Sequence, residues 1–205
     1  LALLATLSIG FAAWYVVQQR AAVEREALAR VSLYARVLEE QTSRTITSAA
    51  QMLRSLAARG TVRLAEADIP SADRLLDQQL PGQPYLRSLA ILDETGRVLV
   101  STNEEDIGHL VDLDALGRGS VDAEGQAIGP VLPIRHLADL RPTVARSAAT
   151  AWPLLRRIPM DDGGPAHWLV AMINPDYLAT QHAVVIGGSN VQVLVSDLRG
   201  RVIST

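Results

Sequence analysis

A group of charged residues lies between two predicted strands, where polar side chains could meet a ligand. It comprises Arg135, His136, Asp139, Arg141 and Arg146, and Trp152 and Trp168 lie on the strands beside it. The planar guanidinium of arginine forms paired hydrogen bonds with a carboxylate, and small-molecule sites combine aromatic walls with a few polar groups. One interpretation is a site for a small, anionic metabolite. The other is that the arginines are solvated loop residues and the tryptophans belong to the core.

The segment Asn174-Pro175-Asp176-Tyr177 follows the last strand of the predicted sheet. Asn174 is suited to cap a helix with Pro175 at its first position, and Asp176 suits the positive end of the helix dipole. Capping therefore explains this segment better than ligand contact does. Tyr177 remains a candidate ligand-binding residue through its hydroxyl group.

The chain offers little for metal, redox or covalent chemistry. It has no cysteine, and its four histidines lack the close spacing of metal ligands: His109, His136, His167 and His182. No nucleotide-binding loop or nucleophile motif is present. The net charge is −3 and the pI is near 5.8, which argues against a nucleic-acid partner. We therefore expect no catalytic residue, no cofactor and no metal site.

The first 60 residues predict one long helical segment. Residues 1–19 carry no charge and are mostly apolar, and a membrane span needs about 20 such residues. We therefore expect a transmembrane helix there, lacking its first residues. Residues 20–60 lack proline and contain apolar residues at steps of three or four, which predicts a long amphipathic helix. It packs on its own domain in one interpretation and also forms a homodimer in the other.

The remainder predicts an α+β fold. A helix is expected over residues 65–80, and residues 88–102 form a hairpin with a tight turn at Asp93–Gly96. Further strands are expected over residues 126–134, 147–158 and 167–173, the first of them interrupted by prolines and hence at an edge. This order indicates a five-stranded antiparallel sheet with helices packed on one face.

The hairpin pattern D-x-x-G-R-V occurs at Asp93 and again at Asp197. A spacing of roughly 100 residues is the size of a domain. We therefore expect residues 179–190 to be a connecting helix and linker, and residues 191–205 to be the opening hairpin of a truncated second unit. That hairpin should not be an integral part of the first sheet.

Four features follow one another along the chain: the membrane helix, the long helix, the stretch PYLRSLAILDETGRVLVSTN at residues 84–103 and the stretch WLVAMINPDYL at residues 168–178. Together they resemble the double Cache sensor regions of bacterial transmembrane receptors. The resemblance implies a PAS-like first unit at residues 61–178 and a periplasmic sensor at the inner membrane. It also implies a small-molecule ligand, such as an organic acid, and an output domain of the histidine kinase or diguanylate cyclase type. The chain lacks the Arg-x-Trp-aromatic pattern of the amino-acid-binding branch, which argues against an amino-acid ligand. The alternative function is a ligand-independent dimerisation spacer.

Overall fold

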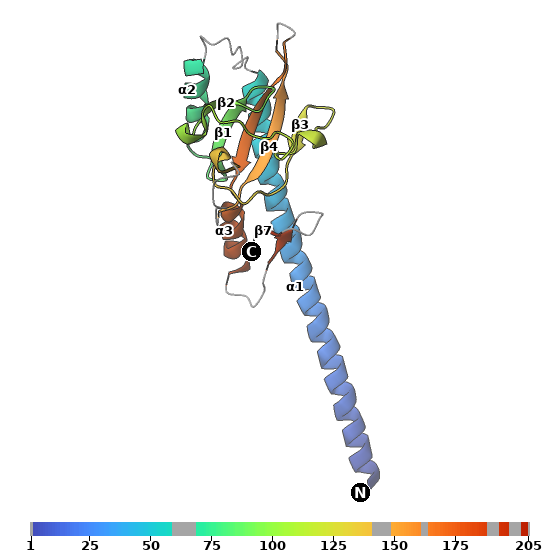
Figure 1. The fold of residues 1–205 in the computed structure, drawn as a ribbon. Coiled ribbons are helices and arrows are strands. Elements are labelled where there is room, and N and C mark those ends of the chain that lie inside the picture. The colour runs from blue at the N-terminus through green and yellow to red at the C-terminus, as the bar shows by residue number, and fades with distance from the viewer. Residues whose placement is uncertain are drawn as a thin grey trace.

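The fold is a small α+β body at one end of a long projecting helix (Figure 1). It is described by a computed structural model. The structure describes residues 2–58, 69–140, 149–160, 164–187, 193–196 and 202–204. This architecture confirms the α+β class and the long helix predicted from the sequence.

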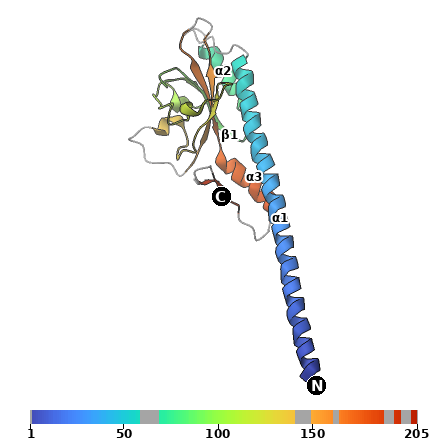
Figure 2. The same ribbon diagram turned by 90° about the vertical axis from the view of Figure 1, so that its right-hand side faces the viewer.

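Helix α1 is a single element of 57 residues, Ala2–Ala58. It contains no proline, and side-chain pairs four residues apart, such as Arg20–Glu24 and Arg44–Glu40, connect its exposed turns. Only its C-terminal part is buried against the sheet, through Ala49, Ala50, Leu53 and Leu56. The N-terminal part of α1 extends away from the body (Figure 2).

The membrane-spanning helix expected over residues 1–19 is not found. Among the described residues, no helix combines the length and the apolar character needed to cross a membrane.

A five-stranded antiparallel sheet forms the centre of the body, in the order β2-β1-β5-β4-β3. Its strands are β1 (Leu86–Leu92), β2 (Val98–Ser101), β3 (Gln126–Ile128), β4 (Trp152–Ile158) and β5 (His167–Ile173). The apolar strand β5 lies in the middle, as its sequence predicts. The shortest strand, β3, lies at the edge and ends before Gly129 and Pro130. The predicted five-stranded sheet is confirmed.

The two faces of the sheet carry separate cores. The helix side packs against α1 and α2 (Ile69–Gln79), with Leu53, Leu76 and Leu169 fully buried. The loop side is covered by residues 103–140, which include three short 3-10 helices: η2 (Glu104–Asp106), η3 (Arg118–Ser120) and η4 (Leu137–Leu140). Because side chains alternate along a strand, neighbouring residues of β1 and β5 enter different cores.

Helix α3 (Pro175–Ile186) follows β5 and lies beside α1 (Figure 2). The predicted cap is present, since the Asn174 side chain accepts a hydrogen bond from the backbone N–H of Asp176 at 3.2 Å. Beyond α3, strands β6 (Val195–Ser196) and β7 (Val202–Ser204) pair as a separate two-stranded sheet. The terminal hairpin is therefore not part of the first sheet, as predicted, while a second unit stays a prediction.

The turn of the first hairpin is held by Asp93. One carboxylate oxygen accepts hydrogen bonds from the backbone N–H groups of Thr95 and Arg97 at 2.8 and 2.9 Å, and from the Thr95 hydroxyl. Burial acts to raise the pKa of Asp93, but these bonds outweigh it and lower the pKa below its usual range. Gly96 closes the turn at a φ of +91°, where a Cβ atom would lie 2.0 Å from the Val111 carbonyl oxygen.

We predict that Gly96→Ala destabilises the fold more than Gly82→Ala. Both glycines have positive φ, but an added Cβ meets nothing within 4 Å at Gly82. The conformational penalty alone is about 1 kcal/mol at Gly82, while the added clash raises the loss to about 3 kcal/mol at Gly96. Chemical denaturation measures both free energies of unfolding. Equal losses would contradict the close approach of Gly96 to Val111.

Candidate functional site

Arg87 occupies a β-bulge on β1. Leu86 pairs with Ile173 and Ser88 with Met172, so Arg87 is the extra residue between two successive pairs. Its side chain is only 13% exposed, and its guanidinium forms an ion pair with Asp176 of α3. The Nε atom of Arg87 is buried and has no hydrogen-bond partner in the described part of the chain. The bulge thus places a largely buried cation at the edge of the loop side.

Two neighbouring side chains each carry a polar atom that has no partner in the described part of the chain. Ser88 pairs with Met172, which belongs to the loop-side core, so the fully buried Ser88 hydroxyl faces that side as well. Thr102 donates a backbone hydrogen bond to Leu89, which brings Asn103 next to the start of β1. Neither the Ser88 hydroxyl nor the Asn103 amide nitrogen has a partner among the described residues.

The loop at residues 135–139 is fastened to the same region. Buried Asp106 accepts hydrogen bonds from the backbone N–H of Ala138 at 2.8 Å and from the Ser101 hydroxyl at 3.2 Å. The Ser101 hydroxyl in turn accepts one from the backbone N–H of Asn103. This connection joins η4 to the end of β2. The buried Nδ1 of His136, in the same loop, also lacks a partner among the described residues.

We name Arg87, Ser88, Asn103 and His136 the loop-side polar cluster. Buried polar atoms in proteins are nearly always hydrogen-bonded, because an unpaired one costs about 1–3 kcal/mol. Four such side chains on one side of a sheet are suited to a polar ligand that supplies the missing partners. Since Arg87 contributes a full positive charge, the group they suit best is a carboxylate.

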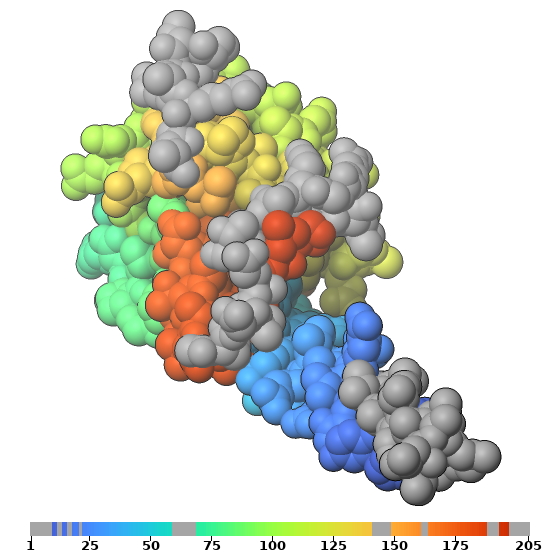
Figure 3. All heavy atoms as spheres, turned by 90° about the horizontal axis from the view of Figure 1, so that it is seen from below, coloured from blue at the N-terminus to red at the C-terminus, as the bar shows by residue number. Residues whose placement is uncertain are grey.

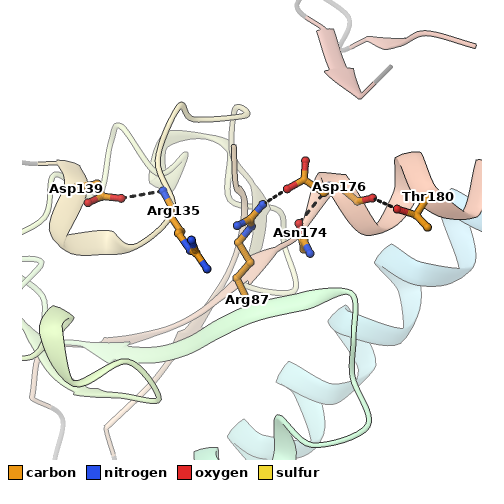
Figure 4. Close-up of polar contacts among 6 residues, drawn as sticks. All are labelled: Arg87, Arg135, Asp139, Asn174, Asp176 and Thr180. Atoms are coloured by element: carbon orange, nitrogen blue, oxygen red, sulfur yellow. Dashed lines mark hydrogen bonds and ion pairs between the residues drawn. The ribbon is translucent and has the colours of Figure 1, made fainter. Parts of the chain in front are cut away.

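The predicted polar site residues are only partly brought together. Figure 4 shows the exposed Arg135 side chain extending on the side of Arg87. Asp139 instead accepts hydrogen bonds from the backbone N–H groups of Arg135 and His136, at 2.9 and 3.0 Å, and so shapes the loop. Arg141 and Arg146 lie outside the described residues.

The predicted aromatic residues do not face one space. Trp152 packs against the helix-side core, where its indole N–H donates to the Gly129 carbonyl at 2.9 Å, whereas Trp168 belongs to the loop-side core. The Tyr177 ring lies 6.3 Å from that of Tyr85. Burial raises the pKa of Tyr85, and the neighbouring Tyr177 raises it further. Of the two tryptophans, only Trp168 faces the loop side.

Helix α3 connects the cluster to α1. At its first turn Asp176 pairs with Arg87, and two turns later the buried His182 lies 3.2 Å from the Thr42 hydroxyl of α1. The Thr42 hydroxyl donates its hydrogen to the Leu38 carbonyl, so His182 Nε2 must be the donor in this contact. Burial lowers the pKa of His182 and favours this neutral form.

Sequence reasoning missed Arg87, Ser88 and Asn103. The available signal was the Arg-Ser pair that interrupts the apolar run of β1. Within the described residues, no group of three or more His, Asp or Glu side chains could hold a metal ion.

No known protein-family profile matches the sequence, and no curated protein matches it. Solved structures do resemble the fold. The extracellular domain of a histidine kinase, rpHK1S-Z16, matches with a TM-score of 0.53 and 18% identity over 70% of this chain and 56% of that chain. The ligand-binding domain of the Campylobacter jejuni chemoreceptor Tlp3, solved with 4-methylisoleucine, matches with a TM-score of 0.54 and 14% identity over 84% and 71%.

The chain shares the fold of these extracellular and ligand-binding domains. The resemblance drawn from the sequence is thereby confirmed at the level of the fold. A second extracellular histidine kinase domain, vpHK1S-Z8, matches with a TM-score of 0.50 and 14% identity over 77% of this chain. The chain spans 56% and 59% of the two kinase domains.

We predict that Asp106→Ala destabilises the fold by about 2 kcal/mol, because it removes the buried carboxylate that accepts hydrogen bonds from the Ala138 N–H and the Ser101 hydroxyl. The matched control is Asp114→Ala, which removes an exposed carboxylate bonded to Arg118 four residues away and should change stability little. Denaturant unfolding measures both. Equal stability of the two variants would contradict the anchoring role of Asp106.

We predict that stability decreases as the pH falls from 7.5 to 5.5, and less so in His182→Gln. The pKa of His182 is lowered in the fold, so below the unfolded value near 6.5 the unfolded chain binds more protons than the native chain. This contribution is present above pH 6.5 and is lost on acidification. Thermal unfolding across this range compares the two proteins. Identical pH slopes would show that His182 is not buried as a neutral group.

Proposed function

We propose that the chain is the ligand-binding sensor unit of a membrane-bound bacterial signalling protein, located in the periplasm. It binds a small organic acid at the loop-side polar cluster and catalyses no reaction itself. The signal that ligand is bound is transmitted along α1 to a histidine kinase or diguanylate cyclase domain elsewhere in the protein. Helix α1 pairs with α1 of a second copy of the chain. The Cache-type fold supports the sensor role.

The observation that carries this proposal is the largely buried guanidinium of Arg87. A buried arginine needs anionic and hydrogen-bonding partners, because removing its charge from water is costly. Its one ion-pair partner among the described residues is Asp176, which is 71% exposed, while its Nε and the nearby Ser88 hydroxyl have no partner. A carboxylate bound here would pair with the Arg87 guanidinium and accept a hydrogen bond from the Ser88 hydroxyl.

The ligand class follows from the same side chains. The Tlp3 domain was also solved with L-valine, at a TM-score of 0.50 and 14% identity. L-Valine and 4-methylisoleucine are amino acids, and each carries a carboxylate. This chain supplies arginine for that group, but the described cluster itself contains no acid to hold an ammonium group. We therefore favour an organic acid without an amine.

We predict that an organic acid stabilises the 205-residue chain in a thermal-shift screen of acetate, succinate, other organic acids and L-amino acids. Arg87→Ala should weaken binding of the best compound by about tenfold or more, since a hydrogen-bonded charge pair contributes about 1.5–3 kcal/mol. Arg157→Ala is the matched control, because Arg157 is exposed and pairs with Trp168 toward the other end of β5. Calorimetry measures the affinities.

Two results would contradict the proposal. One is that no compound in the screen shifts stability or binds, which would favour a ligand-independent spacer. The other is that Arg87→Ala and Arg157→Ala bind the acid equally well, which would place the ligand away from the cluster.

A further inference from the structure

We infer that Asp176 is a built-in competitor for the ligand: its carboxylate occupies Arg87 in the free protein, and an acid that replaces it releases the first turn of α3, which reports to α1. This inference rests on the proposed binding of an acid at Arg87. It adds that binding is an exchange of one carboxylate for another, and it names the helix that responds.

The Arg87–Asp176 pair is unequal in a way that favours exchange. The two side chains face each other in Figure 4. That of Arg87 is 13% exposed and that of Asp176 is 71% exposed. A released Asp176 carboxylate would be solvated by water at little cost, whereas Arg87 left alone would remain a buried, unpaired charge. The guanidinium therefore requires some carboxylate, but not this one. An acid from solution can take the place of Asp176, and the charge of Arg87 then stays neutralised.

The pair also differs from the other ion pairs between described residues. Arg20–Glu24, Arg30–Glu26, Arg44–Glu40 and Arg118–Asp114 each join side chains four residues apart. Arg54 and Glu124 lie 3.6 Å apart and are 45% and 69% exposed. Exposed ion pairs of this kind contribute little to the stability of the fold. Arg87–Asp176 instead joins a bulge in the sheet to the start of a separate helix.

Helix α3 is suited to carry the displacement. Two hydrogen bonds hold Asp176 in the first turn of α3. Its backbone N–H donates to the Asn174 side chain, and its carbonyl accepts from the Thr180 hydroxyl at 2.8 Å, so Asp176 moves with its helix. Leu178 and His182 are buried, and His182 contacts Thr42 of α1. Seen from below, α3 lies at the surface between the body and α1 (Figure 3). A shift at Asp176 therefore reaches α1 through packed side chains.

The test compares wild type with Asp176→Asn in the full 205-residue chain. Calorimetry measures affinity for acetate, succinate and L-valine, and hydrogen exchange follows the amides of residues 174–186. We expect Asp176→Asn to bind the effective acid about fivefold tighter, the factor that matches an ion pair of this exposure. The unliganded variant should show the faster α3 exchange that ligand produces in wild type.

Asn174→Ala is the matched control. It removes the cap of α3 but leaves both charges in place, so it should speed exchange at the first turn without a gain in affinity. If this variant also binds the acid fivefold tighter, helix fraying explains the effect and the competition is overturned.

The remaining outcomes separate the inference from the proposed function. If an acid binds wild type and Asp176→Asn equally well, the inference is overturned and the proposed function stands. Tighter binding with unchanged α3 exchange also overturns it, because the inference requires both. If no acid binds either protein, even with Arg87 unpaired, the proposed function fails and takes the inference with it.

Discussion

The structure depends on how one buried cation is neutralised. Arg87 enters the sheet at a bulge, where two residues of β1 oppose one step of β5, and its side chain is thereby turned toward the edge of the loop side. A guanidinium in this position cannot be left without an anion at acceptable cost. The described chain offers it the exposed carboxylate of Asp176 and leaves its Nε unpaired. Helix α3, the loop at residues 135–139 and the edge of the sheet surround Arg87. Their arrangement therefore affects which anion Arg87 binds.

In the proposed mechanism, the elements around Arg87 convert the choice of anion into a change of packing. On the loop side, buried Asp106 joins β2 to η4 through two hydrogen bonds. Helix α3 is joined to the body at its first turn by the Asn174 cap, the Arg87–Asp176 pair and the buried Pro175 and Leu178, and it contacts α1 through the buried His182. A ligand acts on such a system only through a difference in affinity between two packed states. In the proposed mechanism, the exchange of carboxylates at Arg87 supplies that difference.

The sequence predicted the elements whose local chemistry decides their structure. The turn at Asp93 and Gly96, the apolar central strand β5 and the cap at Asn174 each follow from residue types within a few positions. The site was predicted less well, because alternation along a strand assigns faces only when the register is regular. The bulge at Arg87 hides its direction, and the faces of Trp152 and Trp168 emerge only from the paired strands. The anchoring of Ala138 by Asp106 joins residues far apart in sequence, which no local pattern shows.

The most direct measurement is a crystal structure of the chain with the acid that stabilises it most. The account predicts that the acid's carboxylate lies on the Arg87 guanidinium and within hydrogen-bond distance of the Ser88 hydroxyl, with the Asp176 side chain turned into solvent. An intact Arg87–Asp176 pair, with the acid bound elsewhere on the molecule, would contradict it.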